Sequence, residues 1–571
     1  MAPVLSHPNL KDGVEARAYQ LIAAKEALSC STLLVMPTGL GKTAVQWMAM
    51  AHYLNGDGRI VLVAPTTGLV DQQARMARNM ININPDRIVV LTGQQRPPKR
   101  QEIWKNAKIV IATPHVIRND ARDGRILLSE VDLLIFDEAH HATGSDSMAV
   151  LGDLYLESNS QGMVLAATAS PGVRDDKILE IIQRLGIEKL HVTKRDDDLV
   201  SPYATSMDIE YHHLELNALL KSIIEPLINL EDEEAEFLRR SGFLPGSGII
   251  TTAAIEEAHK RASAAIGKGN VRGYDAAKRI ADLRRLHRLI DLVSTQGLVC
   301  AIKYLQRALN DKDRKTKRFL SLSPVIDLYR NYKDNKEIHP KPGTLSNLTK
   351  KVISSRGKVI IFTEYRDTVD MIVDMLSTIS NVKPGKFVGQ SSKGKQIGMK
   401  QKEQLEQLDN FRSGQINVLV ATSVGEEGLD VPAADCVILY EPVPSAIRAI
   451  QRRGRTARRG DGDVHVLIAK DTRDEFVQHA SARRETAMYR ALERLKKQSR
   501  LPRRSPSSKE ILSSFMVDSK NAGDFILTEI ERLYVEIETE GTTANQNYKI
   551  TETGKDLPTR SKNQRTLIDF D

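Results

Sequence analysis

Residues 36–43 read Met36-Pro37-Thr38-Gly39-Leu40-Gly41-Lys42-Thr43. The stretch matches the phosphate-loop pattern G-x-x-x-x-G-K-[ST], except that Met36 stands where the first glycine is usual. A short apolar run precedes it and helix-compatible residues follow, which is the context that the pattern requires. We expect backbone N–H groups at the start of a helix to bind the phosphates of ATP. Contacts to ATP are expected from Pro37, Thr38, Gly39, Leu40, Gly41, Lys42 and Thr43, with Lys42 on the β- and γ-phosphates and the Thr43 hydroxyl on Mg²⁺.

Short apolar runs rich in β-branched residues alternate with polar, helix-compatible stretches in two parts of the chain. Such runs are typical of strands buried on both faces, and helices between them favour a parallel α/β sheet. The sequence therefore predicts two α/β lobes. The runs of the first lobe are 32–36, 60–64, 109–112, 133–136 and 163–167, and those of the second are 359–362, 418–421, 436–440 and 465–468.

The region between the lobes has a helical pattern. Ile280, Leu283, Leu286 and Leu289 recur at the spacing of one helical face. Residues 260–318 contain 16 Lys or Arg against 5 Asp or Glu. This excess favours an inserted helical domain that binds phosphates, and a bundle that only braces the lobes is the alternative. We expect a first lobe over 1–210, the insertion over 211–345, a second lobe over 346–500, and a linker with a mostly disordered tail over 501–571.

The bulk composition fits a folded protein of several domains. The chain has 571 residues, a net charge of +9 and three widely separated cysteines, which favour buried reduced thiols over a zinc or iron–sulfur site. The start has no basic and apolar leader, and no apolar run approaches the roughly 18 residues that span a bilayer. We expect a cytoplasmic protein that does not enter a membrane.

Two further segments complete a nucleotide site. Asp137 and Glu138 follow an apolar run, so they are expected at the carboxyl end of a strand, where α/β sheets bind ligands. Asp137 suits the Mg²⁺ shell, and Glu138 is placed to orient or deprotonate the attacking water. Upstream, Arg17 and Gln20 are expected near the adenine. The segment Gln451-Arg452-Arg453-Gly454-Arg455-Thr456-Ala457-Arg458 would supply Gln451, Arg455 and Arg458 to catalysis at the γ-phosphate from the second lobe.

These motifs, in this order, resemble those of superfamily 2 helicases. Over about residues 10–500 the chain is similar to the helicase part of archaeal Hef, which resembles the eukaryotic FANCM group. Beyond the three segments above, the resemblance is carried by Ala64-Pro65-Thr66, Ala112-Thr113-Pro114-His115, Thr168-Ala169-Ser170-Pro171-Gly172, Ile361-Phe362-Thr363-Glu364-Tyr365-Arg366, Ala421-Thr422-Ser423-Val424-Gly425-Glu426-Glu427-Gly428-Leu429-Asp430 and Glu441-Pro442-Val443-Pro444-Ser445.

The resemblance implies two RecA-like lobes with ATP between them and an all-helical insertion that grips branched DNA. It implies that Thr168, Ala169 and Ser170 couple hydrolysis to lobe movement, and that Gly428 and Asp430 face the nucleotide. It also implies that the nucleic-acid path is lined by Pro65, Thr66, Thr113, Pro114, Thr363 and Thr422. Within the basic insertion we expect Arg284, Arg285 and Arg288 to contact DNA.

The chain also departs from the family. Full-length Hef proteins carry an XPF-like nuclease, but no Glu-Arg-Lys…Asp signature occurs here, so we expect no nuclease activity and leave open a separate nuclease partner. The last residues, 564–571, resemble the box that binds the sliding clamp PCNA. Gln564, Leu567 and Phe570 fit that box, whereas Asp571 replaces its second aromatic residue.

The sequence thus predicts an ATP-dependent DNA helicase or translocase that remodels branched DNA such as stalled forks. Two alternatives remain open. A double-stranded RNA-dependent ATPase of the RIG-I or Dicer type has a related layout, and a non-catalytic scaffold would bind ATP only as a clamp.

Overall fold

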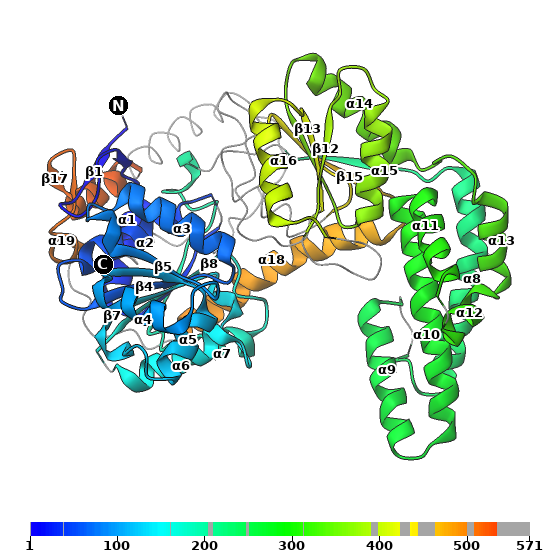
Figure 1. Ribbon diagram of the computed structural model, residues 1–571, viewed down its shortest axis with the longest axis horizontal. Coiled ribbons are helices and arrows are strands. Elements are labelled where there is room, and N and C mark those ends of the chain that lie inside the picture. The colour runs from blue at the N-terminus through cyan, green and yellow to red at the C-terminus, as the bar shows by residue number, and fades with distance from the viewer. Residues whose placement is uncertain are drawn as a thin grey trace, which may run out of the picture.

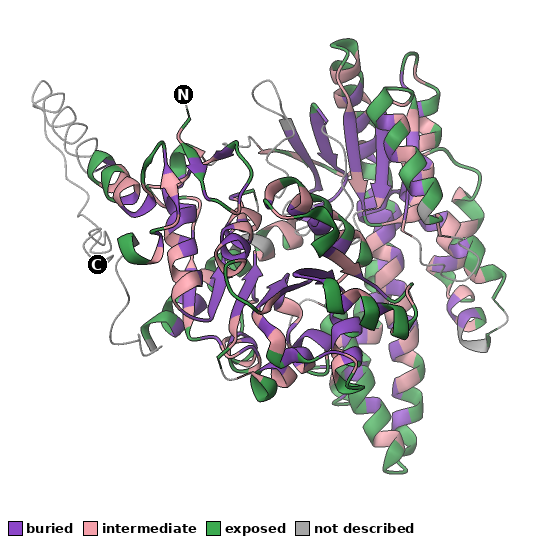
Figure 2. Ribbon diagram, turned by 60° about the vertical axis from the view of Figure 1, so that its left-hand side comes forward, coloured by how far each residue is buried: buried purple, intermediate pink, exposed green. Residues whose placement is uncertain are grey.

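The computed structural model describes residues 2–37, 39–159, 161–203, 209–246, 250–311, 313–389, 398–422, 434–442, 463–498 and 508–533. Within these residues the chain forms two lobes, each built on a parallel sheet, and a helical arm that extends from the second lobe (Figure 1). Figure 2 shows that most strands of the two sheets are buried while the flanking helices carry exposed residues, which explains why most of these strands have apolar sequences.

The first lobe contains a seven-stranded parallel sheet, as far as the structure describes it, in the order β5-β6-β4-β7-β8-β3-β9. Alternate residues of each strand enter different cores: Leu34 packs on one face of the sheet, and Leu33 and Val35 on the other. The strands are β3 (Thr32–Val35), β4 (Arg59–Val63), β5 (Ile88–Leu91), β6 (Ile109–Ala112), β7 (Val131–Asp137), β8 (Met163–Thr168) and β9 (Lys189–Val192). The helices are α1 (Ala18–Ser29), α2 (Lys42–Tyr53), α3 (Thr67–Met80), α4 (Pro97–Asn106), α5 (Pro114–Arg122), α6 (Ser147–Ser158) and α7 (Asp175–Arg184).

The second lobe has a six-stranded parallel sheet among its described residues, in the order β10-β15-β14-β11-β13-β12. Its strands are β10 (Ile209–Leu214), β11 (Val359–Thr363), β12 (Pro384–Phe387), β13 (Val418–Thr422), β14 (Cys436–Leu439) and β15 (Asp463–Ala469). Helices α14 (Pro340–Ser354), α15 (Arg366–Ser377) and α16 (Gln401–Ser413) accompany it. The boundaries expected at residues 210 and 345 fall inside two of these elements, β10 and α14. β10 belongs to the second sheet, and its partly exposed edge position hid it from a search for buried runs.

The arm between β10 and α14 is all helical where the structure describes it. Its elements are α8 (Ala218–Arg240), α9 (Thr252–Gly267), α10 (Val271–Asp291), the π-helix η5 (Leu292–Gln296), α11 (Leu298–Leu309), α12 (Arg314–Leu320) and α13 (Ser323–Tyr332). One apolar cluster lies near the second lobe, and another joins α8, α9 and α10 farther out. The end at which α9 meets α10 is the part of the arm farthest from both sheets (Figure 1).

The chain returns from the second lobe to the first through α18 (Arg473–Gln498), drawn in orange in Figure 1. Met488, Ala491, Leu492 and Leu495 of this helix are buried in a core of the first lobe. The structure then corrects the expectation of a linker and tail from residue 501, because residues 508–533 fold on the first lobe.

That C-terminal segment contains α19 (Ser508–Ile511), β16 (Met516–Val517), β17 (Lys520–Asn521) and helical residues 522–533. Among the described residues its strands join β1 (Val4–Ser6) and β2 (Val14–Glu15) in the sheet β17-β16-β1-β2. Leu512 and Phe515 are fully buried in the first-lobe core. Burial of this kind stabilises by about 1.5–3 kcal/mol per large apolar side chain.

Cys30, Cys300 and Cys436 are buried free thiols, as expected from their spacing. In the portion of the chain that the structure describes, no helix has the length and apolar character that crossing a membrane requires.

Candidate active site

The phosphate loop connects β3 to α2. Gly39 and Gly41 have φ values of 87° and 85°, in the left-handed region that favours glycine. A Cβ atom on Gly41 would also lie 2.3 Å from Gln20 Nε2, so the loop needs glycine here for space as well as conformation. Met36, which replaces the usual first glycine, is fully buried in the apolar core, so this position serves packing.

Lys42 is the first residue of α2, and its buried Nζ donates a hydrogen bond to the carbonyl oxygen of Met36 at 3.0 Å. Thr43 follows in the first turn. The N-terminal N–H groups of a helix have no partner within the helix and attract anions. The loop thus presents a lysine, a hydroxyl and the start of a helix together, as the sequence predicted.

The residues expected near the adenine brace this loop. Gln20 Nε2 and the Tyr19 hydroxyl both donate to the Leu40 carbonyl oxygen, at 2.9 and 3.0 Å. Arg17 pairs with Glu15 at 2.9 Å, and its guanidinium lies 5.0 Å from the ring centroid of Tyr203. These contacts fix the loop, and the expected adenine contacts of Arg17 and Gln20 stay predictions.

Asp137 and Glu138 lie at the carboxyl end of β7, and both are buried. Asp137 accepts hydrogen bonds from Gln46 Nε2 of α2 at 3.2 Å and from Gln73 Nε2 of α3 at 2.8 Å. Burial raises the pKa of Asp137, and the neighbouring Glu138 raises it further. Sequence analysis missed both glutamines. The only signal was that Gln46 lies four residues after Lys42, on the same face of the helix.

Glu138 has a φ of 54°, which is rare for a residue with a side chain and typical of functional sites. Its carboxylate lies 3.4 Å from His140 Nδ1, and that nitrogen lies 3.2 Å from the Thr168 hydroxyl. The Thr168 hydroxyl also accepts a hydrogen bond from the Ser170 backbone N–H at 3.2 Å. A chain of polar contacts therefore joins Glu138 to the Thr168–Ser170 motif.

The residues expected along the nucleic-acid path of the first lobe lie together. Pro65 and Thr66 follow β4, while Thr113 and Pro114 follow β6, and these strands are paired neighbours. Thr66 caps α3 by accepting from Leu69 N–H at 3.3 Å. All four residues lie at the carboxyl ends of neighbouring strands, which is compatible with the predicted nucleic-acid path.

The corresponding threonines of the second lobe differ from each other. Thr363 and Thr422 are register partners at the ends of β11 and β13. Thr422 is half-buried, whereas Thr363 is fully buried and its hydroxyl donates to Glu441 Oε2 at 3.2 Å. In this conformation Thr363 is therefore not accessible to DNA.

The three arginines chosen as DNA contacts have partners within the protein. Arg284 pairs with Glu256 of α9 at 3.0 Å, and Arg285 donates to the Thr316 hydroxyl of α12 at 3.2 Å. Arg288 donates to the Tyr365 hydroxyl at 2.6 Å and stacks 4.2 Å from the centroid of that ring. In this conformation they hold the arm together and join it to the second lobe, and the expected DNA contacts of these arginines stay predictions.

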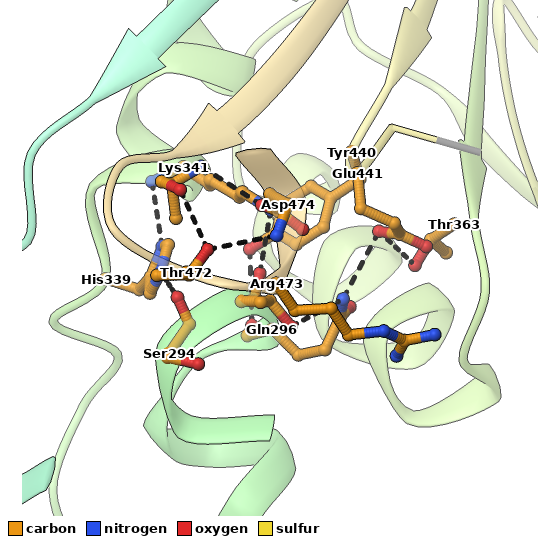
Figure 3. Close-up of polar contacts among 12 residues, drawn as sticks. Ser294, Gln296, His339, Lys341, Thr363, Tyr440, Glu441, Thr472, Arg473 and Asp474 are labelled. Carbon is orange, nitrogen blue, oxygen red and sulfur yellow. Dashed lines mark hydrogen bonds and ion pairs between the residues drawn. The ribbon is translucent and has the colours of Figure 1, made fainter. Parts of the chain in front are cut away.

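A buried polar network, which we call the arm joint, connects the π-helix of the arm to the strand ends of the second lobe (Figure 3). Glu441, just after β14, accepts from Thr363 and, at 3.4 Å, from Gln296 Nε2. Burial raises the pKa of Glu441 to about 7, although nearby Lys341 opposes the shift. Gln296 also accepts from the Thr368 hydroxyl at 2.8 Å.

Lys341 is the cation of the arm joint and is completely buried. Its Nζ lies 2.6 Å from Asp474 Oδ2 and donates to the Thr295 carbonyl oxygen at 2.9 Å. The same Nζ lies 5.1 Å from the centroid of the Tyr440 ring. Because these groups come from η5, α14, α18 and the residues just after β14, the network fixes four parts of the chain relative to one another (Figure 3).

Several predicted site residues lie outside the described residues. They are Thr38 of the phosphate loop, Gly428, Asp430, Gln451, Arg455 and Arg458 of the second lobe, and Gln564, Leu567 and Phe570 near the end of the chain.

Comparison with known proteins agrees with this architecture. Residues 17–176 match the DEAD/DEAH box helicase family, and residues 341–460 match the helicase conserved C-terminal domain. The first range lies in the first lobe, and the second starts within α14. Both matches contain the predicted nucleotide motifs of their lobe.

The chain is similar to the crystal structure of the Hef helicase domain from Pyrococcus furiosus, with a TM-score of 0.65 and 36% identity, covering 81% of this chain and 98% of that one. A Methanocaldococcus jannaschii protein, named for ATP-dependent RNA helicase activity, is 36% identical over 496 residues, or 86% of this chain and 62% of the relative. The Schizosaccharomyces pombe protein fml2, named for ATP-dependent DNA helicase activity, is 29% identical over 529 residues, or 89% and 68%. The chain therefore belongs to the Hef family of superfamily 2 helicases.

Proposed function

We propose that this protein is an ATP-driven DNA helicase or translocase that remodels branched DNA, such as stalled replication forks, in repair and recombination. The observation that carries the proposal is the buried Asp137–Glu138 pair beside Lys42 of the phosphate loop, in a chain that is similar to the Hef helicase domain over 81% of its length. An ATPase and unwinding assay on forks, Holliday junctions and single strands tests it. No stimulation of ATP turnover by any of these DNAs would contradict it.

The first-lobe site fits Mg²⁺. Two carboxyl groups are buried there, and Lys42 is the cation that opposes the rise in the pKa of Asp137. A divalent cation would supply the further positive charge, held by Asp137 and the Thr43 hydroxyl. When bound it would neutralise charge on the phosphates. Lys42 would bind the β- and γ-phosphates, and Glu138 would orient the attacking water and accept its proton.

The second lobe would complete the reaction. Gly428 and Asp430 would face the nucleotide, and Gln451, Arg455 and Arg458 would stabilise the charge on the γ-phosphate. Hydrolysis would then depend on closure of the lobes, and closing and reopening would move the DNA strand. These assignments rest on the sequence motifs and on the match of residues 341–460 to the helicase C-terminal family.

The outer end of the arm offers a DNA contact that sequence analysis did not single out. Lys268, Arg272 and Lys278 are exposed there, as are Val271 at 80% and Tyr274 at 57%. Cations would contact phosphates, and an exposed ring can stack on an unpaired base. We place the branch contact at this tip, in preference to Arg284, Arg285 and Arg288.

Replacement of Lys268, Arg272 and Lys278 by Ala should weaken fork binding about tenfold, because up to three phosphate contacts are lost. The slope of log K against log salt should become shallower by up to about 2.7. Replacement of exposed Arg330, Lys333 and Lys336 by Ala, nearer the second lobe, is the control of equal charge. Equal losses in the two triple variants would point to general attraction and contradict a contact at the tip.

A second candidate substrate is duplex RNA, since the M. jannaschii relative is named for RNA helicase activity. Stimulation of ATP turnover by duplex RNA above that by fork DNA would favour it. The alternative of a scaffold that only binds ATP predicts no phosphate release with any nucleic acid.

We further propose that the chain end binds the sliding clamp PCNA through Gln564, Leu567 and Phe570. The spacing of these residues supports the proposal, and Asp571 in place of a second aromatic residue limits the affinity to the micromolar range, about 8 kcal/mol. Deletion of residues 564–571 should remove clamp binding in calorimetry and leave DNA-stimulated ATPase unchanged. An unchanged clamp affinity after the deletion would refute this role. A separate nuclease remains a possible further partner.

A further inference from the structure

A histidine pair and a carboxylate converge on one face of the second sheet, in β10 and β15. Glu210 of β10 is the register partner of His465 of β15, and His212 lies two residues farther along β10. Register partners and residues two apart project from the same face of a sheet, so strand geometry brings these three side chains together. We call them the edge triad.

The spacing of the ligand atoms matches a metal site. His212 Nε2 lies 3.1 Å from His465 Nδ1, which lies 3.2 Å from Glu210 Oε2, and Glu210 Oε1 lies 3.7 Å from His212 Nε2. Atoms about 2.0–2.1 Å from a tetrahedral Zn²⁺ lie about 3.4 Å from one another. One ligand atom from each of the three residues lies within 4.8 Å of the other two, which is close enough for them to share one ion.

Hydrogen bonds alone satisfy the close contacts among these three side chains poorly. If His212 Nε2 donates to His465 Nδ1, the latter atom presents no proton to the carboxylate 3.2 Å away. If His465 Nδ1 donates to Glu210, the short contact between the two rings has no proton aimed along it. A cation at the centre satisfies two imidazole nitrogens and a carboxylate together.

We propose that Glu210, His212 and His465 bind a transition-metal ion, with Zn²⁺ as the best fit, and that the ion clips β10 to β15. Two histidines, one carboxylate and an open fourth position form a common ligand set for zinc. The side chains of His465 and His212 are only 9% and 18% exposed, whereas Glu210 is 64% exposed, so water can complete the shell.

The edge triad is separate from the nucleotide site. It lies near the amino-terminal ends of its strands, whereas nucleotides bind at the carboxyl ends of parallel strands. β10 lies at the edge of the sheet and pairs with β15 within the described strands. The ion would thus secure the strand that leads into the arm to the strand that follows the Gln451–Arg458 motif in the sequence.

The test uses the full chain, stripped with a chelator and titrated with Zn²⁺ against a competing chromophoric chelator. The chain contains 13 histidines and three cysteines, so variants must identify the site. His212→Ala and Glu210→Gln should each weaken the tightest Zn²⁺ binding by about 10–100-fold or more, since even outer-shell changes cost that much. Zn²⁺ should raise the melting midpoint of the wild type and not that of His212→Ala.

His213→Ala is the matched control. His213 is the next residue of the same strand, and its Nδ1 lies 3.6 Å from Glu475 instead. This variant should bind Zn²⁺ as the wild type does. Co²⁺ provides an independent readout, because a four-coordinate site gives visible absorption bands that His212→Gln should abolish even if its folding changes. Equal Zn²⁺ affinity in wild type and His212→Ala, or Co²⁺ bands that survive in His212→Gln, would overturn the proposal.

Discussion

The two lobes place buried carboxyl groups at the same kind of position and give them different surroundings. Asp137 ends β7 and Glu441 follows β14, both at the carboxyl edge of a parallel sheet. Burial raises the pKa of each. Asp137 is held by two glutamines beside the phosphate loop, whereas Glu441 is enclosed by Thr363 and the π-helix of the arm. The two carboxyl groups thus differ in what packs over the strand end, which is α2 and α3 at Asp137 and the arm at Glu441.

The largest effect is expected on catalysis in the first lobe. Glu138→Gln should lower DNA-stimulated ATP turnover by about 10²–10⁴-fold, because the amide cannot accept the proton of the attacking water. ATP binding should remain. Phosphate release and nucleotide binding are the two measurements, and Glu130→Gln, before the start of β7, is the control. Turnover near the wild-type rate in Glu138→Gln would remove Glu138 from the mechanism.

The second largest effect is expected on the stability of the arm joint. Lys341→Met leaves the buried Asp474 without its cation, which should cost about 3–5 kcal/mol in urea unfolding of the second lobe. Lys341→Met combined with Asp474→Asn should recover part of this loss. Lys42→Met is the comparison variant. We expect it to abolish ATP turnover and to change the free energy of unfolding less than Lys341→Met does. Equal destabilisation by the two lysine variants would erase the distinction between site and joint.

A smaller effect concerns pH. Glu441 has a pKa of about 7 in the folded protein, against an ordinary 4.5. Between these values the folded state binds more protons than the unfolded state, so the contribution of Glu441 to stability falls as pH rises from about 4.5 to 7 and then levels off. Glu441→Gln should make the melting midpoint less dependent on pH over that range. Parallel pH profiles for the wild type and the variant would show that Glu441 does not titrate there.

The buried features of both lobes were predictable because they are local in sequence. Apolar runs identified most strands of the two sheets, and the Lys42 and Asp137 motifs marked two segments that the fold brings close together. β10 escaped because an edge strand is only partly buried and lacks an apolar run. Sequence position could not show that Gln73 reaches Asp137, since 64 residues separate them.

The arginines of the insertion show a different limit. The count of charged residues identified a basic region, but it could not show which cationic side chains face solvent and which contact another part of the protein. Arg285 and Arg288 have partners 31 and 77 residues away, whereas Lys268 and Arg272 are exposed at the outer end of the arm. The packing of α10 against α12 and against Tyr365, just before α15, separates the two groups.

The pairing of β1 with β16 has a consequence for synthesis on the ribosome. One edge of β1 pairs with nearby β2, but the partner of its other edge, β16, lies about 510 residues downstream. At about 5–20 residues per second, translation takes roughly 25 to 100 s to supply that partner. During this interval the β1 edge and the apolar surface later covered by Leu512 and Phe515 are open to other chains, so the nascent protein would depend on chaperones.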